Sequence, residues 1–248
     1  MRKDSFITGN FYCCGKPLKD APVWGMSIRS AGSMRFRWNE TNPLRDNFLS
    51  ELAGDSYDIV PVELVHSKTV YSVSSSNDTF NLKGDGIITV NKRLIPVVTA
   101  ADCMPIFIFD RKTGVYGALH SGWKGTGIVE TAIMQARRDY GSYPADFCVV
   151  MAPHIHECCY DVDKNRAVYF IKKFSADCVT DKGNGIYGLS LANANLAVLK
   201  KIGIKEENIY ISPDCTCCNE KFGSFRRESV AVSGGLENFT VQAAWIKW

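Results

Sequence analysis

The sequence MPIFIFDRKTGVYGALH, residues 104–120, decides the fold class. Two runs rich in aromatic and β-branched residues, MPIFIF and VYGALH, flank the polar turn DRKTG, which is the pattern of a β-hairpin. We expect the turn to pair Phe109 with Val115. Cys103 and His120 would then lie near the same end of two adjacent antiparallel strands and face each other across the pair.

Outside this hairpin, the sequence predicts further strands and helices. Strands are expected at residues 93–98, 147–151, 209–212 and 240–248, and helices at 127–140, 163–173 and 189–202. Because the strands outnumber the helices and come in hairpins, a mixed, largely antiparallel α+β fold is favoured over a doubly wound parallel sheet. With 248 residues, of which 46% are apolar, the chain is expected to form one domain over residues 1–248.

Charge and hydropathy exclude several classes of protein. The net charge is +3 with acids and bases interspersed, so no basic surface for nucleic acid is expected. The N-terminus lacks the apolar stretch of a secretory signal, and no later segment approaches the roughly 18 apolar residues of a membrane span. We therefore expect a cytoplasmic protein without membrane contact, whose 10 cysteines stay free or bind metal.

His66, Cys103 and His120 each lie at the end of a strand-like run. Structural zinc sites usually draw four ligands from close pairs, whereas these three residues are separated by 37 and 17 positions. Three dispersed ligands with a fourth position open are typical of a catalytic zinc. The sequence therefore predicts a zinc site, with copper less favoured.

A glycine-rich turn, SGWKGT, follows His120 and precedes the predicted helix at 127–140. Backbone N–H groups at a helix N-terminus suit a phosphate or a carboxylate. A tight turn that needs positive φ at Gly122 or Gly125 explains the glycines equally well. The sequence leaves both interpretations open.

Seven blocks of this sequence resemble, in order and spacing, those of the laccase-domain family, whose members were first labelled multicopper polyphenol oxidases and are now treated as zinc-dependent purine nucleoside phosphorylases. The blocks are SIRSAG at 27–32, LVHS at 64–67, TAADCMP at 99–105, LHSGWKG at 119–125, APHI at 152–155, CCYDV at 158–162 and FGSFRRE at 222–228. The chain departs from the family pattern at Ile28, Ala31, Leu64 and Lys124, and in the FGSF that replaces FFSY. These departures bear more on substrate choice than on metal binding.

The resemblance implies an α/β/β/α sandwich related to cysteine-dependent deamidase toxins, with His66, Cys103 and His120 as zinc ligands and catalytic residues. It also implies phosphorolysis of adenosine, inosine or methylthioadenosine, with some adenosine deamination. The expected partners are therefore a purine nucleoside and phosphate, bound by a monomer or a weak homo-oligomer.

Arg29 and Arg226 are the candidates for binding phosphate, because an arginine can hold a phosphate through two parallel hydrogen bonds. Alternation along a strand would point only one of Arg226 and Arg227 inward, and Arg226 is favoured. Asp102 is expected at the substrate site as well, where it either orients a ligand histidine or caps the turn before the hairpin.

The remaining histidines and cysteines give weaker signals. We expect His154, beside His156, to be a solvated loop residue. Cys215 and Cys218 have the C-x-x-C spacing of metal sites, and with Cys158, Cys159 and Cys217 they raise the question of a second metal. The resemblance implies similar cysteines without a metal, so free thiols are the expectation.

Three functions are alternatives to a zinc-dependent phosphorylase. Cys103 as nucleophile, His120 as base and backbone N–H groups near Gly122 as oxyanion hole would make a cysteine amidase, of the kind that edits peptidoglycan precursors. A multicopper oxidase needs many histidines, and this chain has only 4. A non-enzymatic binding module would hold its metal with four protein ligands.

Overall fold

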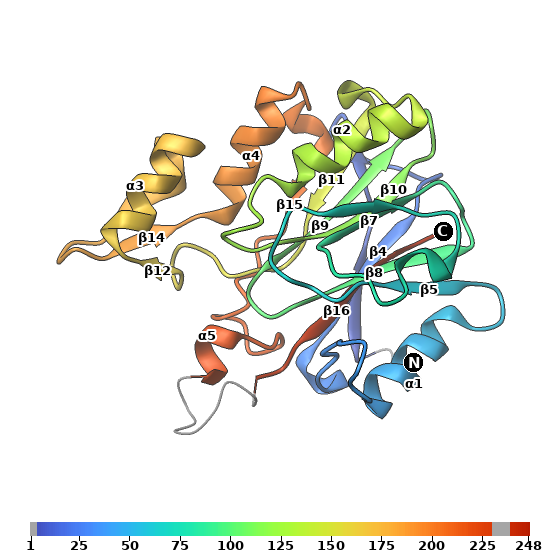
Figure 1. Ribbon diagram of the computed structural model, residues 1–248. Helices are drawn as coiled ribbons and strands as arrows, with labels where there is room; N and C mark the ends of the chain where they lie inside the picture. Colours follow the sequence, from blue (N-terminus) through green and yellow to red (C-terminus); the bar gives the residue numbers. More distant parts are fainter. Residues whose placement is uncertain (1–3, 230–238) are drawn as a thin grey trace.

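The computed structural model describes residues 4–229 and 239–248. Two β-sheets pack face to face, and helices cover their outer faces, so the expected α/β/β/α sandwich is confirmed (Figure 1). Most strand pairs are antiparallel, as predicted. The parallel pairs are β5–β8, β6–β7 and β11–β15.

The first sheet has five strands and carries α1 on its outer face. Across the sheet they are β1 (Phe6–Gly9), β4 (Val23–Ser27), β16 (Gln242–Lys247), β8 (Leu94–Ala100) and β5 (Asp58–Pro61). Helix α1 (Pro43–Ala53) begins where Asn42 accepts a hydrogen bond from the N–H of Arg45, with proline at the first helical position. Its buried side chains, among them Phe48, pack on Trp245 of β16.

The second sheet has six strands, and α2 (Ile128–Tyr140) and α4 (Leu191–Lys201) cover it. Across the sheet they are β15 (Ile209–Ile211), β11 (Phe147–Met151), β9 (Met104–Asp110), β10 (Tyr116–Ser121), β7 (Gly86–Thr89) and β6 (Val70–Ser72). The predicted helices and strands match these elements within about two residues at most ends, and β11 matches at both.

The apolar hairpin lies in the middle of the second sheet, between its two covering layers. Phe107 and Phe109 face the first sheet, whereas Ile106 and Ile108 face the helices. A strand buried on both faces needs apolar side chains at every position, which explains the unbroken run MPIFIF.

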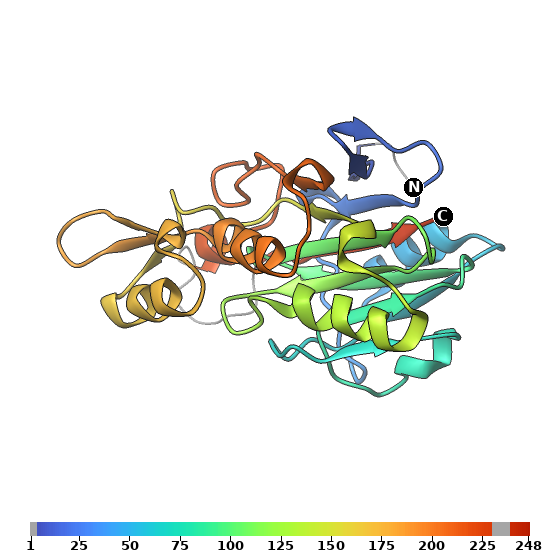
Figure 2. The same cartoon turned by 90° about the horizontal axis from the view of Figure 1, so that it is seen from above.

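A smaller unit extends to one side of the two sheets in both views (Figures 1 and 2). It contains α3 (Lys164–Lys173), which Asp163 caps, and the three-stranded sheet β12 (Asp161–Val162), β14 (Tyr187–Leu189) and β13 (Val179–Asp181). Outside this unit and the two large sheets, the chain also forms the hairpin of β2 (Tyr12–Cys13) and β3 (Lys16–Pro17) and the short helix α5 (Phe225–Glu228). The 3-10 helices are Arg29–Ala31, Ser76–Thr79, Pro144–Asp146, Ala176–Cys178 and Glu206–Asn208.

Two sequence-based predictions about strands are wrong in detail. Phe109 pairs with Tyr116 and not with Val115, because Val115 still belongs to the turn, where its carbonyl accepts the N–H of Asp110. His66 lies in the loop between β5 and β6 and not at a strand end. In the described part of the chain, no helix has the length and apolar character to cross a membrane.

Candidate metal centre and substrate cavity

His66, Cys103 and His120 converge although they come from three separate segments. One ligand atom from each residue lies within 4.8 Å of the others. His120 is part of β10, Cys103 immediately precedes β9, and His66 lies in the loop after β5. His120 pairs with Pro105 and Cys103 lies just before the paired strand, so the two residues lie at the same end of the hairpin, as predicted, but not directly opposite each other.

The orientation of His120 is set by a buried carboxylate that the sequence analysis missed. His120 Nδ1 lies 2.9 Å from Asp85 Oδ1, and the backbone N–H of His120 donates to the carbonyl of Asp85 at 2.7 Å. Because a carboxylate accepts, the Nδ1 nitrogen carries a proton, which leaves Nε2 as the ring nitrogen that can bind a metal. This is the usual arrangement of a metal-binding histidine.

Asp85 also fixes the loop that carries His66. The N–H groups of His66 and Ser67 donate to its two carboxylate oxygens at 2.9 and 2.6 Å, and Ser67 Oγ donates at 2.6 Å. His66 has φ +59°, a conformation that is uncommon outside glycine and that these bonds hold in place. Burial opposes ionisation of Asp85, but the hydrogen bonds from His120 and Ser67 outweigh it and lower its pKa.

Cys103 is held in its ionised form by the two histidines. Burial alone would raise the pKa of its thiol, but His120 and His66 outweigh this effect and lower the pKa to about 6. The same pairing, together with Asp85, raises the pKa of His120. A thiolate is the form of cysteine that binds metal and that attacks electrophiles.

These donors fit a zinc ion. Two imidazoles and one thiolate form a borderline-soft donor set, which zinc accepts in tetrahedral sites. Within residues 4–229 and 239–248, no fourth histidine, cysteine or carboxylate joins the group. Three protein donors leave one position for a substrate, as in catalytic zinc sites.

Gly122 is needed because Cys103 lies against it. A Cβ atom at position 122 would come within 2.9 Å of Cys103 Sγ and 3.3 Å of His66 Cδ2, and one at Gly125 within 2.8 Å of the Ser67 carbonyl. Neither glycine has a positive φ, so the tight-turn explanation is wrong. The helix N-terminus is also engaged within the protein, since the N–H of Gly127 donates to Asn195.

A cavity of about 730 Å³ opens over the three residues. Its walls are aromatic and cationic. The aromatic side chains are Phe36, Trp123, Tyr160, Phe225 and Phe239, and the cationic ones are Arg35, Arg37, Arg166 and Arg226. The Arg166 guanidinium lies 4.3 Å from the centre of the Trp123 ring, and that of Arg226 lies 5.6 Å from the Tyr160 ring.

Of the two arginines predicted to bind phosphate, the structure brings only Arg226 to the cavity. Arg226 donates to the carbonyl of Asp161 at 3.3 Å. Arg29 does not line the cavity. It pairs with Glu228 at 3.4 Å, and its side chain is half exposed. Arg227 is directed away and donates to the carbonyls of Thr216 and Cys217. Arg226 and Arg227 both belong to helix α5, so the strand alternation assumed from the sequence is wrong.

Asp102 lines the cavity, and its carboxylate holds the segment that carries Arg226. It accepts hydrogen bonds from Thr216 Oγ1 at 2.7 Å, Ser224 Oγ at 3.0 Å and the N–H of Arg226 at 2.6 Å. Asp102 is buried and has φ +77°. The carboxylate that orients a ligand histidine is therefore Asp85 and not Asp102.

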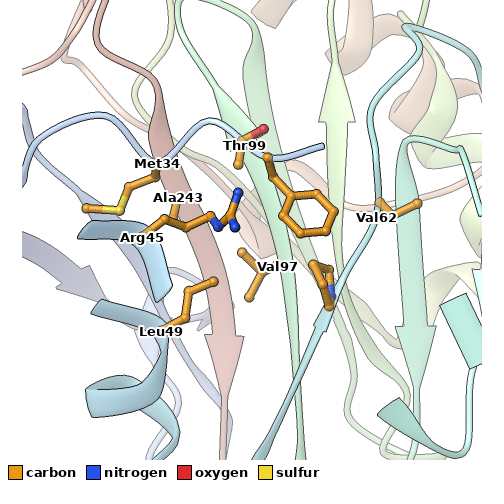
Figure 3. Close-up of a pocket in the computed structure, with 9 residues that line it drawn as sticks. Met34, Arg45, Leu49, Val62, Val97, Thr99 and Ala243 are labelled. Atoms are coloured by element: carbon orange, nitrogen blue, oxygen red, sulfur yellow. The ribbon is translucent and has the colours of Figure 1, made fainter. Parts of the chain in front are cut away.

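Arg45 holds the segment that carries Arg35 and Phe36, two residues of the cavity wall. Its guanidinium donates to the carbonyls of Arg35 and Glu40 and lies 5.0 Å from the Phe36 ring. Figure 3 shows this side chain extending from α1 toward Thr99, in a small cavity of about 10 Å³. Because Phe36 and Thr99 line both cavities, Arg45 fixes the segment that presents Arg35 to the larger one.

The prediction that His154 is solvated is wrong. Only 1% of the residue is exposed, and its Nδ1 lies 2.8 Å from the Ala152 carbonyl. Burial lowers its pKa to about 3, so this histidine is neutral and structural. Its backbone forms an isolated β-bridge with Cys215.

Comparison with known proteins agrees with this architecture. The family described as "Multi-copper polyphenol oxidoreductase laccase" matches residues 41–240. The chain belongs to this family. A relative from Borreliella burgdorferi, named purine nucleoside phosphorylase, is 31% identical over 192 residues, which cover 72% of this chain and 81% of the relative. YlmD of Bacillus subtilis, also named a purine nucleoside phosphorylase, is 34% identical over 62% of this chain and 57% of its own length.

Two solved structures share the fold of nearly the whole chain. The crystal structure of YlmD from Geobacillus stearothermophilus superposes with a TM-score of 0.81 and 25% identity, covering 96% of each chain. The hypothetical protein YfiH from Bacillus licheniformis gives a TM-score of 0.80 at 24% identity, over 91% of this chain and 92% of that one. The laccase family fold therefore extends over nearly the whole chain.

Replacing Asp85 by asparagine is expected to weaken zinc binding. Asp85→Asn removes the charge that orients His120 and holds the His66 loop, and loss of such a partner typically costs roughly 10- to 100-fold in metal affinity. Competition with a chromophoric chelator measures the change. Asp110→Asn is the matched control, because Asp110 is equally buried but caps the hairpin turn. Equal weakening in both variants would show a general loss of stability.

Gly122→Ala is expected to reduce zinc affinity at least about tenfold, because the added methyl group displaces Cys103 or His66. The same chelator competition measures it, and circular dichroism checks the fold. Lys124→Ala, an exposed position in the same turn, serves as control. Unchanged affinity in Gly122→Ala would contradict the close packing described above.

Proposed function

We propose that this protein is a zinc-dependent purine nucleoside phosphorylase, which cleaves the N-glycosidic bond of adenosine, inosine or methylthioadenosine with phosphate. The observation that carries the proposal is the His66, Cys103 and His120 group beside a cavity walled by aromatic rings and arginines. Family membership and the names of the relatives support it.

The size and walls of the cavity suit these substrates. Pockets for small ligands usually measure about 300–1,000 Å³, and a purine nucleoside with phosphate falls within this range. The rings of Phe36, Trp123 and Tyr160 offer flat apolar faces to a purine. Arg166 and Arg226 lie over two of these rings, so the positive charge is placed beside the aromatic surface.

The arginines supply what phosphorolysis requires of the protein. A phosphate oxygen attacks C1′ of the ribose while the C1′–N9 bond breaks and the purine leaves with the electron pair. The phosphate dianion must be held in line, and bidentate contacts from arginine provide both charge and direction. Arg226 is prepared for this role, since Asp102 fixes its backbone and the Asp161 carbonyl its guanidinium.

A zinc ion bound by His66, Cys103 and His120 would supply Lewis acidity to an oxygen atom of the substrates. The residues around it keep the donors ready. Asp85 orients His120 so that its Nε2 is the nitrogen available to the metal, and the two histidines keep Cys103 ionised. Hydrolytic deamination of adenosine would use the same cavity, with water as the second substrate in place of phosphate.

Cysteine amide hydrolysis is the second candidate, and one observation favours it. Cys103, His120 and Asp85 follow one another as nucleophile, base and orienting carboxylate do in catalytic triads. A metal ion on the thiolate would block this chemistry, so metal content separates the two candidates. Copper oxidation is disfavoured, because the described residues contain no cluster of histidines for a trinuclear centre.

The deciding experiment combines elemental analysis with a chromatographic assay of adenosine, inosine and methylthioadenosine, each with and without phosphate. Zinc at the His66, Cys103 and His120 site and phosphate-dependent release of free base are expected, and both should disappear in Cys103→Ala. Full turnover by Cys103→Ala would contradict the role of the metal. Protein without zinc at the His66 and His120 site, together with covalent trapping of Cys103 by a substrate-like electrophile, would establish the hydrolase instead.

Replacing Arg226 is expected to weaken phosphate binding. Arg226→Ala should raise the KM for phosphate about 10- to 100-fold, because a hydrogen bond to a charged group contributes about 1.5–3 kcal/mol. Zinc content should stay unchanged. Arg138→Ala, on the exposed part of α2, is the control. A larger effect from Arg29→Ala than from Arg226→Ala would reverse the assignment of the phosphate site.

A further inference from the structure

A second group of metal-binding side chains lies outside the cavity. Cys158 and Cys159 lie in the loop between β11 and β12, and Cys215 and Cys218 come from the segment after β15. Their four sulfur atoms all lie within 4.8 Å of one another. Cys218 Sγ lies 3.6 Å from Cys158 Sγ and 3.2 Å from Cys159 Sγ. The sulfurs of Cys158 and Cys159 are 3.8 Å apart.

These separations match the donor shell of one metal ion. Four thiolates at about 2.3 Å from a tetrahedral zinc are about 3.8 Å from each other. A disulfide would bring two sulfurs to about 2.05 Å, and all four of these cysteines are free thiols. Apolar burial does not explain the grouping either, because Cys158 and Cys218 are exposed.

The backbone around the four cysteines is ordered by hydrogen bonds. The N–H of His156 donates to Cys215 Sγ at 3.4 Å, and the N–H of Thr216 donates to the His154 carbonyl at 3.0 Å. Each loop also contains a turn. The N–H of Cys159 donates to the carbonyl of His156, and the N–H of Asn219 donates to the carbonyl of Cys215. Hydrogen bonds of this kind orient metal ligands before the metal binds.

We propose that Cys158, Cys159, Cys215 and Cys218 bind a structural zinc ion. Four thiolates fill all positions of a tetrahedral ion, so no position remains for a substrate. The site has the C-x-x-C spacing at 215–218, and its sulfur geometry supports the second metal site that the sequence analysis disfavoured. The ion would join two loops that are about 60 positions apart in the chain.

The position of this site gives it a consequence for the cavity. Tyr160, which lines the cavity, directly follows Cys159. Thr216 directly follows Cys215 and donates to Asp102, the neighbour of Cys103. The structural zinc therefore holds two parts of the cavity wall without touching the substrate.

Metal counting on single variants tests the proposal. Wild-type protein loaded with zinc and freed of loose metal should hold about two zinc ions per chain, and Cys218→Ser about one. His120→Ala should also hold about one, lost from the other site, and the double variant should hold none. Cys217→Ser is the matched control and should keep both ions, since its sulfur is not one of the four.

The count does not depend on nucleoside turnover, so failure of the proposed function would leave this test valid. A second zinc that survives in Cys218→Ser, or is absent from wild type, overturns the proposal. A mass deficit of two hydrogens at these cysteines under non-reducing conditions also overturns it, because it reports a disulfide. If Cys218→Ser does not fold, alkylation of the four thiols in the wild-type protein tests the site instead. The four thiols should resist it with zinc and react after chelation, and equal reactivity in both states contradicts the site.

Discussion

The buried carboxylate of Asp85 is the interaction on which the candidate site depends. A buried charge is costly unless it is paired and hydrogen-bonded, and Asp85 meets this condition with donors from two separate segments. It lies immediately before β7, opposite the end of β10, where it reaches both His120 and the loop of His66. The sheet and the loop therefore act as one rigid support for the two histidines, and the strained φ of His66 is offset by the same hydrogen bonds.

Asp102 performs the corresponding task on the other side of Cys103. Its carboxylate fixes Thr216, Ser224 and the backbone of Arg226, so the distant segment 212–228 forms a wall of the cavity. Both His66 and Asp102 adopt positive φ, and both lie next to reactive groups. Strained backbone of this kind persists only where surrounding contacts determine it, and here the contacts come from the two aspartates.

Local chemistry explains which features could be predicted from the sequence. The hairpin, the helices and the candidate ligands His66, Cys103 and His120 follow from apolar patterns and residue types, and these survive an error of one residue in register. Asp85 was missed because its role depends on strand pairing, which puts Gly86 opposite Leu119 and hence Asp85 beside His120. Arg29 was assigned to phosphate from its motif alone, whereas the fold turns it toward Glu228. Long-range pairing, which no local pattern contains, decides both cases.

The number of protein donors separates the roles of the two cysteine-containing groups. At Cys103, two histidines and one thiolate leave an opening toward a cavity of about 730 Å³. At Cys215 and its three partners, four thiolates would close the shell. The two groups are nevertheless connected, because Cys215 adjoins Thr216, Thr216 bonds Asp102, and Asp102 precedes Cys103. A closed site beside an open one would be a physically sensible division, since the first would fix the wall against which the second would hold its substrate.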